Sequence, residues 1–112
     1  MEDNKLIAEF MGMTYGDPND DSVMIQKTPQ GNEVVPIESM EYYTSWHWLM
    51  PVVEKIESLG YAFEKNYQRV DKDWQSLIVK GNDILYQEFN DDGLKSSYYV
   101  VVEFIKQYND GR

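Results

Sequence analysis

His47 is the only histidine in a chain of 112 residues that contains no cysteine. A histidine acts as a general base only with a nucleophile in hydrogen-bond reach, and catalytic relays and zinc sites need further members. In the helix predicted around it, His47 shares a face with Pro51, Glu54 and Ser58, opposite an apolar stripe. This pattern is typical of an exposed residue near a helix N-terminus, so we predict no catalytic residue.

The carboxylates do not predict a metal site either. Asp17, Asn19 and Asp21 alternate as they do at the start of an EF-hand calcium loop. The match ends there, because Ser22 stands where that loop needs glycine and Thr28 stands where it needs a bidentate glutamate. We expect an acidic turn, and neither a metal nor a cofactor.

Charge is the strongest compositional signal, since twenty Asp and Glu against ten Lys and Arg give a net charge of −10. Binding to nucleic acid relies on Lys and Arg neutralising phosphates, so no direct binding to DNA or RNA is expected. Acidic lipid surfaces are disfavoured for the same reason, and no membrane association is expected. The charge favours a basic protein partner, although acidity by itself also keeps a small protein soluble.

A candidate interaction surface combines aromatic, imidazole and carboxylate side chains. Trp46 and Trp48 are one residue apart, so they cannot share one narrow helix face. Trp46 belongs to the apolar stripe, which leaves Trp48 at the edge of the core or against a partner. The candidate residues are His47, Trp48, Asp20, Asp21, Asp91 and Asp92.

These residues are expected to be held by a single α+β domain covering residues 1–112. Apolar spacing predicts a short N-terminal helix, a central helix, an antiparallel three-stranded meander and a C-terminal helix. The C-terminal run would suit a strand on propensity alone, but its spacing is helical. Pro51 inside the central helix predicts a kink or an irregular first turn. The predicted ranges are Asn4–Met11, Thr44–Gly60, Tyr61–Val70, Trp74–Lys80, Ile84–Phe89 and Ser97–Tyr108.

The signals are weaker between residues 12 and 43. Clusters of turn-forming residues surround two short β-prone runs, Val23–Lys27 and Glu33–Ile37. This segment is predicted to be rich in loops or to form a weak extra hairpin. In the meander, the last two strands are apolar on both faces, which predicts that both faces of that sheet are covered.

Three segments together resemble small phage and prophage proteins of the phage "ABA sandwich" domain type. They are Asn4–Gly12, Thr44–Ile56 and Val101–Asn109, which follow the LIAEFMG, TSWDWLMPVVEKIE and VVEFIKWYN boxes of that type in the same order. The resemblance implies that all three are helices and that the domain has α-β-α layers. His47 stands where the family commonly has aspartate and Gln107 where it commonly has tryptophan. The resemblance implies no activity.

The function expected from these observations is a non-catalytic protein-interaction module, a phage-type accessory protein that binds a basic host or phage protein. Two alternatives stay open: a structural component that self-associates, and a small enzyme or ligand-binding domain that uses His47. A deep pocket at His47 would favour the last. The N-terminal sequence lacks a secretory signal, and no stretch approaches the ~20 apolar residues of a membrane helix, so we expect a cytoplasmic protein. The oligomeric state is left open.

Overall fold

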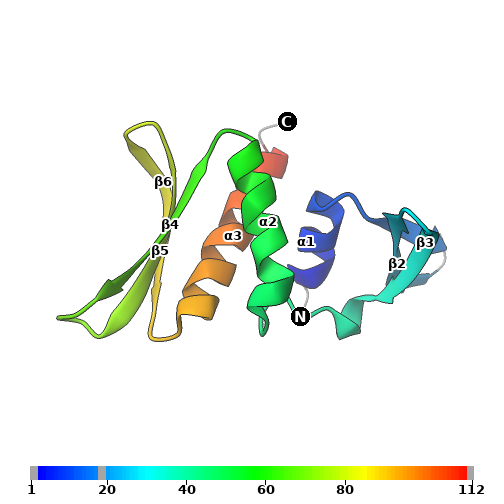
Figure 1. Cartoon of the computed structure of the whole chain (residues 1–112), viewed down its shortest axis with the longest axis horizontal. Helices are drawn as coiled ribbons and strands as arrows, with labels where there is room; N and C mark the ends of the chain where they lie inside the picture. The colour runs from blue at the N-terminus through cyan, green and yellow to red at the C-terminus, as the bar shows by residue number, and fades with distance from the viewer. Residues whose placement is uncertain (1–2, 18–19, 111–112) are drawn as a thin grey trace.

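The computed structural model describes the backbone of residues 3–17 and 20–110, and the side chains of all of these except residues 16, 17, 20 and 21. Over these residues the chain forms three α helices and two three-stranded antiparallel sheets, with helices packed on the sheets (Figure 1). The predicted α+β class is confirmed. The elements are α1 (Asp3–Phe10), β1 (Thr14–Asp17), β2 (Asp20–Thr28), β3 (Gly31–Pro36), the 3-10 helix η1 (Ile37–Ser39), α2 (Trp46–Ser58), β4 (Ala62–Gln68), β5 (Asp73–Lys80), β6 (Asp83–Asn90) and α3 (Gly93–Asp110).

The meander predicted for the C-terminal half is present, with β5 between β4 and β6. A two-residue turn joins β5 to β6, and its Gly81 has φ 63°, a left-handed conformation that glycine adopts without a steric penalty. The pairing moves from Ile78 opposite Tyr86 to Val79 opposite Ile84, so β6 contains a bulge. A bulge of this kind increases the local twist of a strand.

Helix α3 approaches this sheet closely at its first turn. The Ser76 hydroxyl of β5 lies 2.7 Å from the Ser96 hydroxyl and 3.0 Å from the Ser97 hydroxyl, and all three side chains are buried. A Cβ atom at Gly93 would lie 3.2 Å from the Trp74 ring. Small residues at the contact therefore allow the helix backbone to pack directly on β5.

Helix α2 has the predicted extent but buries a different set of residues. The spacing predicts a stripe that includes Trp46 and Met50; instead Met50 is exposed, Trp46 is half-buried and Val52 is buried. Pro51 lies inside the helix, which runs through it from Trp46 to Ser58. The buried residues of α2 are Leu49, Val52, Val53 and Ile56.

The segment 12–43, predicted as loops or a weak hairpin, contains the sheet β1–β3 followed by η1. In this small sheet Met24 and Val35, which pair across β2 and β3, are buried as part of the central hydrophobic core. The Tyr15 hydroxyl in β1 donates a 2.6 Å hydrogen bond to the Glu9 carboxylate in α1. The buried Asn4 amide of α1 donates to the Met40 carbonyl after η1, at 3.0 Å.

The layers follow a different order from the predicted α-β-α arrangement. Figure 1 shows the helices between the two sheets, so that α2 and α3 cover only one face of β4–β6. The molecule is correspondingly elongated, at 48 × 27 × 25 Å. Within the described part of the chain, no helix is long and apolar enough to cross a membrane.

Candidate binding pocket at the start of helix α2

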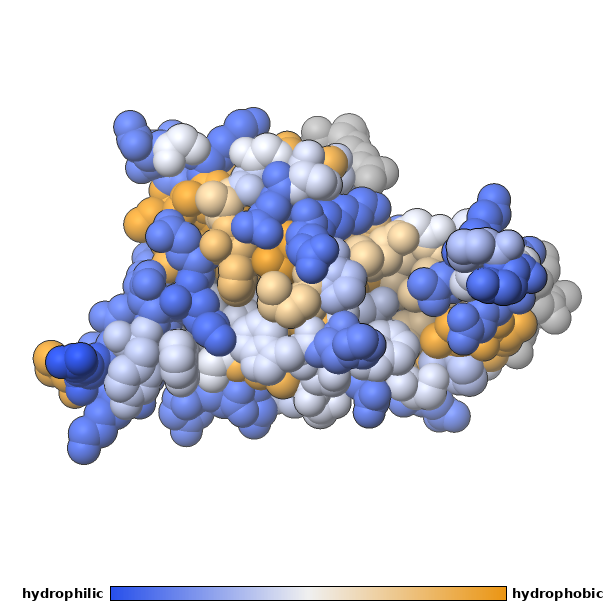
Figure 2. Space-filling view, in the orientation of Figure 1, coloured by the Kyte–Doolittle hydropathy of each residue, from blue (hydrophilic) through white to orange (hydrophobic). Residues whose placement is uncertain are grey.

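Two of the predicted surface residues, His47 and Trp48, line the same open pocket. Its volume is about 210 Å³, and it lies where the end of α1, strand β2 and the first turn of α2 meet. Figure 2 shows weakly hydrophobic surface in this region between the helices and the small sheet. The lining residues are Met11, Met13, Gln26, Tyr42, His47, Trp48 and Pro51.

The two methionines reach the pocket because the chain turns sharply at the end of α1. Gly12 has φ 90°, and the Met11 and Met13 amides donate to the carbonyls of Ile7 and Ala8 at 2.9 and 3.0 Å. A glycine in the left-handed conformation after the last helical residue is a common C-terminal cap. The cap places one thioether on each side of the turn.

The aromatic wall of the pocket is formed by Tyr42 and Trp48, whose ring centroids lie 5.2 Å apart at an interplanar angle of 86°. This edge-to-face arrangement is a favourable geometry for aromatic pairs. Tyr42 is buried, and burial raises the pKa of its phenol to about 12. The Tyr42 hydroxyl therefore stays protonated near neutral pH and is a poor nucleophile or base there.

His47 is exposed at the rim of this pocket, on the same helix face as Pro51. The lining contains no carboxylate, lysine, serine or threonine that could complete a proton relay with the imidazole. Because Pro51 has no amide hydrogen, the His47 carbonyl also lacks the usual helical donor four residues later. The pocket can accept an apolar or aromatic group, but its side chains do not form an acid–base pair.

The predicted carboxylate pairs are not brought together. Asp91 is exposed between β6 and α3, whereas Asp20 and Asp21 start β2 in the small sheet at the other end of the molecule (Figure 1). The side chains of Asp20 and Asp21 lie outside what the structure describes, as does Asn19 of the expected acidic turn.

Asp92, the fourth of these carboxylates, has a structural role. Its Oδ1 accepts hydrogen bonds from the Leu94 amide at 2.9 Å and the Lys95 amide at 3.2 Å, so it caps the N-terminus of α3. The candidate surface residue Asp92 is thus committed to the first turn of the helix. Among the described residues, no group of three or more His, Asp and Glu side chains is arranged to hold a metal ion.

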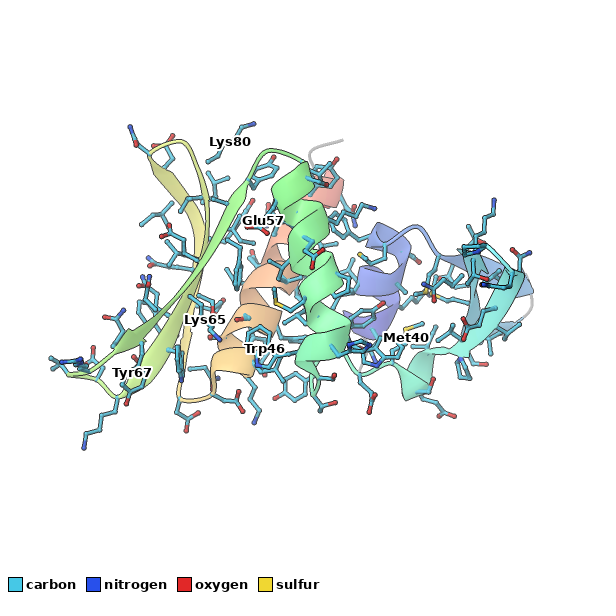
Figure 3. The ribbon with its side chains drawn as sticks, viewed as in Figure 1. Met40, Trp46, Glu57, Lys65, Tyr67 and Lys80 are labelled. Carbon is cyan, nitrogen blue, oxygen red and sulfur yellow. The ribbon has the colours of Figure 1, made fainter. Side chains whose placement is uncertain are left out.

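A second, shallower groove separates α2 from β4. It is lined by Trp46, Met50, Phe63 and Lys65. The Lys65 ammonium lies 4.1 Å from the ring centroid of Trp46 and 4.8 Å from that of Trp74, and Figure 3 shows Lys65 and Trp46 facing each other across the groove. Cation–π contacts of this kind hold a lysine over aromatic surface that would otherwise be open to solvent.

Sequence reasoning missed most of the pocket, because its lining comes from four separate segments. Only Gly12 offers a local signal for the pocket, because a glycine after an apolar helical stretch predicts a helix end and therefore a turn between Met11 and Met13. Nothing in the local sequence connects Gln26 or Tyr42 with His47.

Comparison of the chain with protein-family models, with curated proteins and with solved structures finds no match.

Proposed function

We propose that this chain is a non-catalytic interaction module that binds a basic protein, in the manner of a phage-type accessory protein acting in the host cytoplasm. The observation that carries the proposal is the net charge of −10, twice as many acidic as basic residues, in a chain of only 112 residues. A surface of this kind attracts basic partners over long range and repels nucleic acid.

The chemistry of the pocket supports a binding role over catalysis. His47 has no carboxylate or hydroxyl partner among the lining residues except Tyr42, whose raised pKa keeps it protonated. Trp, Tyr and Met are, in contrast, enriched where proteins bind one another. The alternative of a small enzyme that uses His47 lacks a second functional group.

The proposal is tested by affinity capture with the whole chain from a lysate of the natural host, at low and at high salt. A basic protein bound near stoichiometry and released as salt rises is the expected result, because salt screens contacts between exposed charges. A partner retained equally at both salt concentrations, or recovery of the bait alone, would contradict the proposal.

Charge-reversal variants make this test more specific. Asp91→Lys removes an exposed carboxylate, whereas Asp92 must be left intact because its loss would weaken the start of α3. The double variant Asp20→Lys/Asp21→Lys reverses the other predicted pair. Each reversal is expected to weaken capture at low salt and to change little at high salt; capture unaffected by any reversal would remove charge as the basis of binding.

A further inference from the structure

The outer face of the β4–β6 sheet, opposite α2 and α3, is not covered by any helix in Figure 1. The face of each strand residue follows from the strand pairing. Ser76 contacts α3, so its neighbour Leu77 points outward, as do the residues paired with Leu77 in β4 and β6, Glu64 and Gln87. Leu77 is only 6% exposed, yet it lies outside the central hydrophobic core.

Several apolar side chains lie on this outer face. Ala62, Val79 and Ile84 lie in one row across the three strands, because Val79 pairs with both Ala62 and Ile84. The bulge in β6 turns Ile84 to this side. Two large residues on this face are more than half exposed: Ile84 at 57% and Phe89 at 51%. We call Ala62, Leu77, Val79, Ile84 and Phe89 the outer patch.

A chain of amide hydrogen bonds crosses the same face. The Gln68 amide donates to the Gln75 side-chain oxygen at 3.2 Å, and the Gln75 amide donates to the Gln87 oxygen at 2.9 Å. These bonds link β4, β5 and β6 through their side chains. Because these side chains already make contacts with one another, they lose less entropy when a partner binds.

The charged strand residues on this face all have one sign. Glu64 and Asp73 both point outward by the strand pairing; Glu64 is exposed, whereas one carboxylate oxygen of Asp73, Oδ1, is buried. The two lysines of the three strands, Lys65 and Lys80, lie on the helix side, where their ammonium groups sit over the rings of Trp46 and Tyr61 at 4.1 and 5.1 Å. The outer patch is thus bordered by carboxylates and by amides, without a basic strand residue.

We propose that the outer patch binds an amphipathic helix of the basic partner, one whose apolar stripe is flanked by Lys or Arg; this rests on the function proposed above. The sheet already packs helices on its opposite face, and a helix on the outer face would bury the patch in the same way. A second copy of this chain fits less well, because face-to-face association would place Glu64 and Asp73 against carboxylates of the same sign.

The test is a titration of the ¹⁵N-labelled full-length chain with a synthetic amphipathic helical peptide of Leu and Lys, followed by amide chemical shifts. Shifts are expected in β4–β6 at the outer patch. The double variant Ile84→Ser/Phe89→Ser is expected to weaken binding by about tenfold or more, because it removes the two most exposed apolar contacts. Glu64→Gln is expected to weaken binding a few-fold and to reduce its salt dependence.

Matched controls separate this surface from the rest of the chain. Val34, 60% exposed in the small sheet, is replaced by Ser and is expected to leave binding unchanged. A peptide with Glu in place of Lys is expected not to bind. Amide spectra of the free variants verify that they fold, and the high exposure of both substituted residues favours that result.

Three outcomes would overturn the proposal, and they differ in what they leave standing. In the first, chemical-shift changes are confined to the pocket of His47 and Trp48, and the double variant binds as well as the unaltered chain. This would assign the binding site to that pocket and leave the proposed function standing. No binding of the Lys peptide, together with no basic protein captured from lysate, would remove both. Concentration-dependent shifts at the outer patch without peptide would assign the face to a second copy.

Discussion

The two sheets of this molecule have the same number of strands but differ in how many of their residues are buried and in how much helix packs against them. The β4–β6 sheet packs α3 along β5 and β6, with Ile78 and the Ser76 hydroxyl buried beneath the helix. The β1–β3 sheet has only Met24 and Val35 as buried strand residues among those described, and it rests on a helix of eight residues. Local stability depends on how much buried apolar contact a segment makes. The comparison indicates a rigid C-terminal half and a more easily opened N-terminal sheet.

The largest expected effect is from Phe104→Ala in α3. Phe104 is buried and contacts the rings of Phe10, Tyr61 and Tyr86 edge-on, so it joins α1, β6 and the start of β4. Its truncation is expected to lower the free energy of unfolding by about 3–5 kcal/mol. Urea unfolding measures this, and both sheets are expected to lose amide protection. A loss below about 1 kcal/mol would show that the core is not centred on α3.

Met24→Ala probes the weaker sheet. Met24 is fully buried, and its truncation is expected to lower the free energy of opening the β1–β3 sheet by about 2–5 kcal/mol. Because few other contacts hold β1–β3, we expect faster hydrogen exchange in those strands while the amides of β5 and α3 stay protected. Equal loss of protection in both sheets would mean that the molecule unfolds as one unit.

Alkaline pH tests the junction between the two halves at Tyr42. Burial raises the pKa of Tyr42 from 10.0 to about 12, so the folded state favours the neutral phenol. The neutral phenol therefore contributes fully to the free energy of unfolding below pH 10. This contribution falls by on the order of 2 kcal/mol as the pH rises from 10 to 12. Urea unfolding at a series of pH values should show this fall, and Tyr42→Phe should reduce it. Tyr67→Phe, at a side chain 51% exposed, is the control for the loss of a tyrosine hydroxyl that is not buried.

The smallest expected effect is at the start of α3. Asp92→Ala removes the N-terminal cap and is expected to cost about 1 kcal/mol in thermal or urea unfolding. Asp91→Ala, at the exposed neighbour, is expected to change stability by less than about 0.5 kcal/mol. Similar losses in the two variants would mean that the carboxylates act by charge rather than by capping.

The helices and the meander could be predicted because their signals are local. One signal is the apolar stripe at helical spacing that ends at Gly60, and another is the Gly81–Asn82 link between two β-prone runs. Both depend only on residues a few positions apart in the sequence. The small sheet was harder to predict, since its strands depend on burying Met24 and Val35 in the central core, most of whose residues are distant from β2 and β3 in the chain. Short strands of this kind are stabilised by packing more than by propensity.

The candidate site shows the same division. His47 and Trp48 were noted for their types, and both line the pocket. Apart from Pro51 of α2, its other residues come from the turn after α1, from β2 and from the loop before α2. Asp92 was noted as charge, and only its distance to two backbone amides shows that it is a cap. In the sequence, a carboxylate in a turn cannot be distinguished from one that caps a helix unless the first residue of the helix is known.

The sequence by itself determined the α+β class, the three helices, the meander and the acidity, because composition and periodicity act along the chain. Only the tertiary structure decided the layer order, which leaves one face of β4–β6 open although β5 and β6 are apolar on both sides. The alternation of a strand shows that two faces are apolar, but it does not show which neighbour, within the chain or in another molecule, covers each of them.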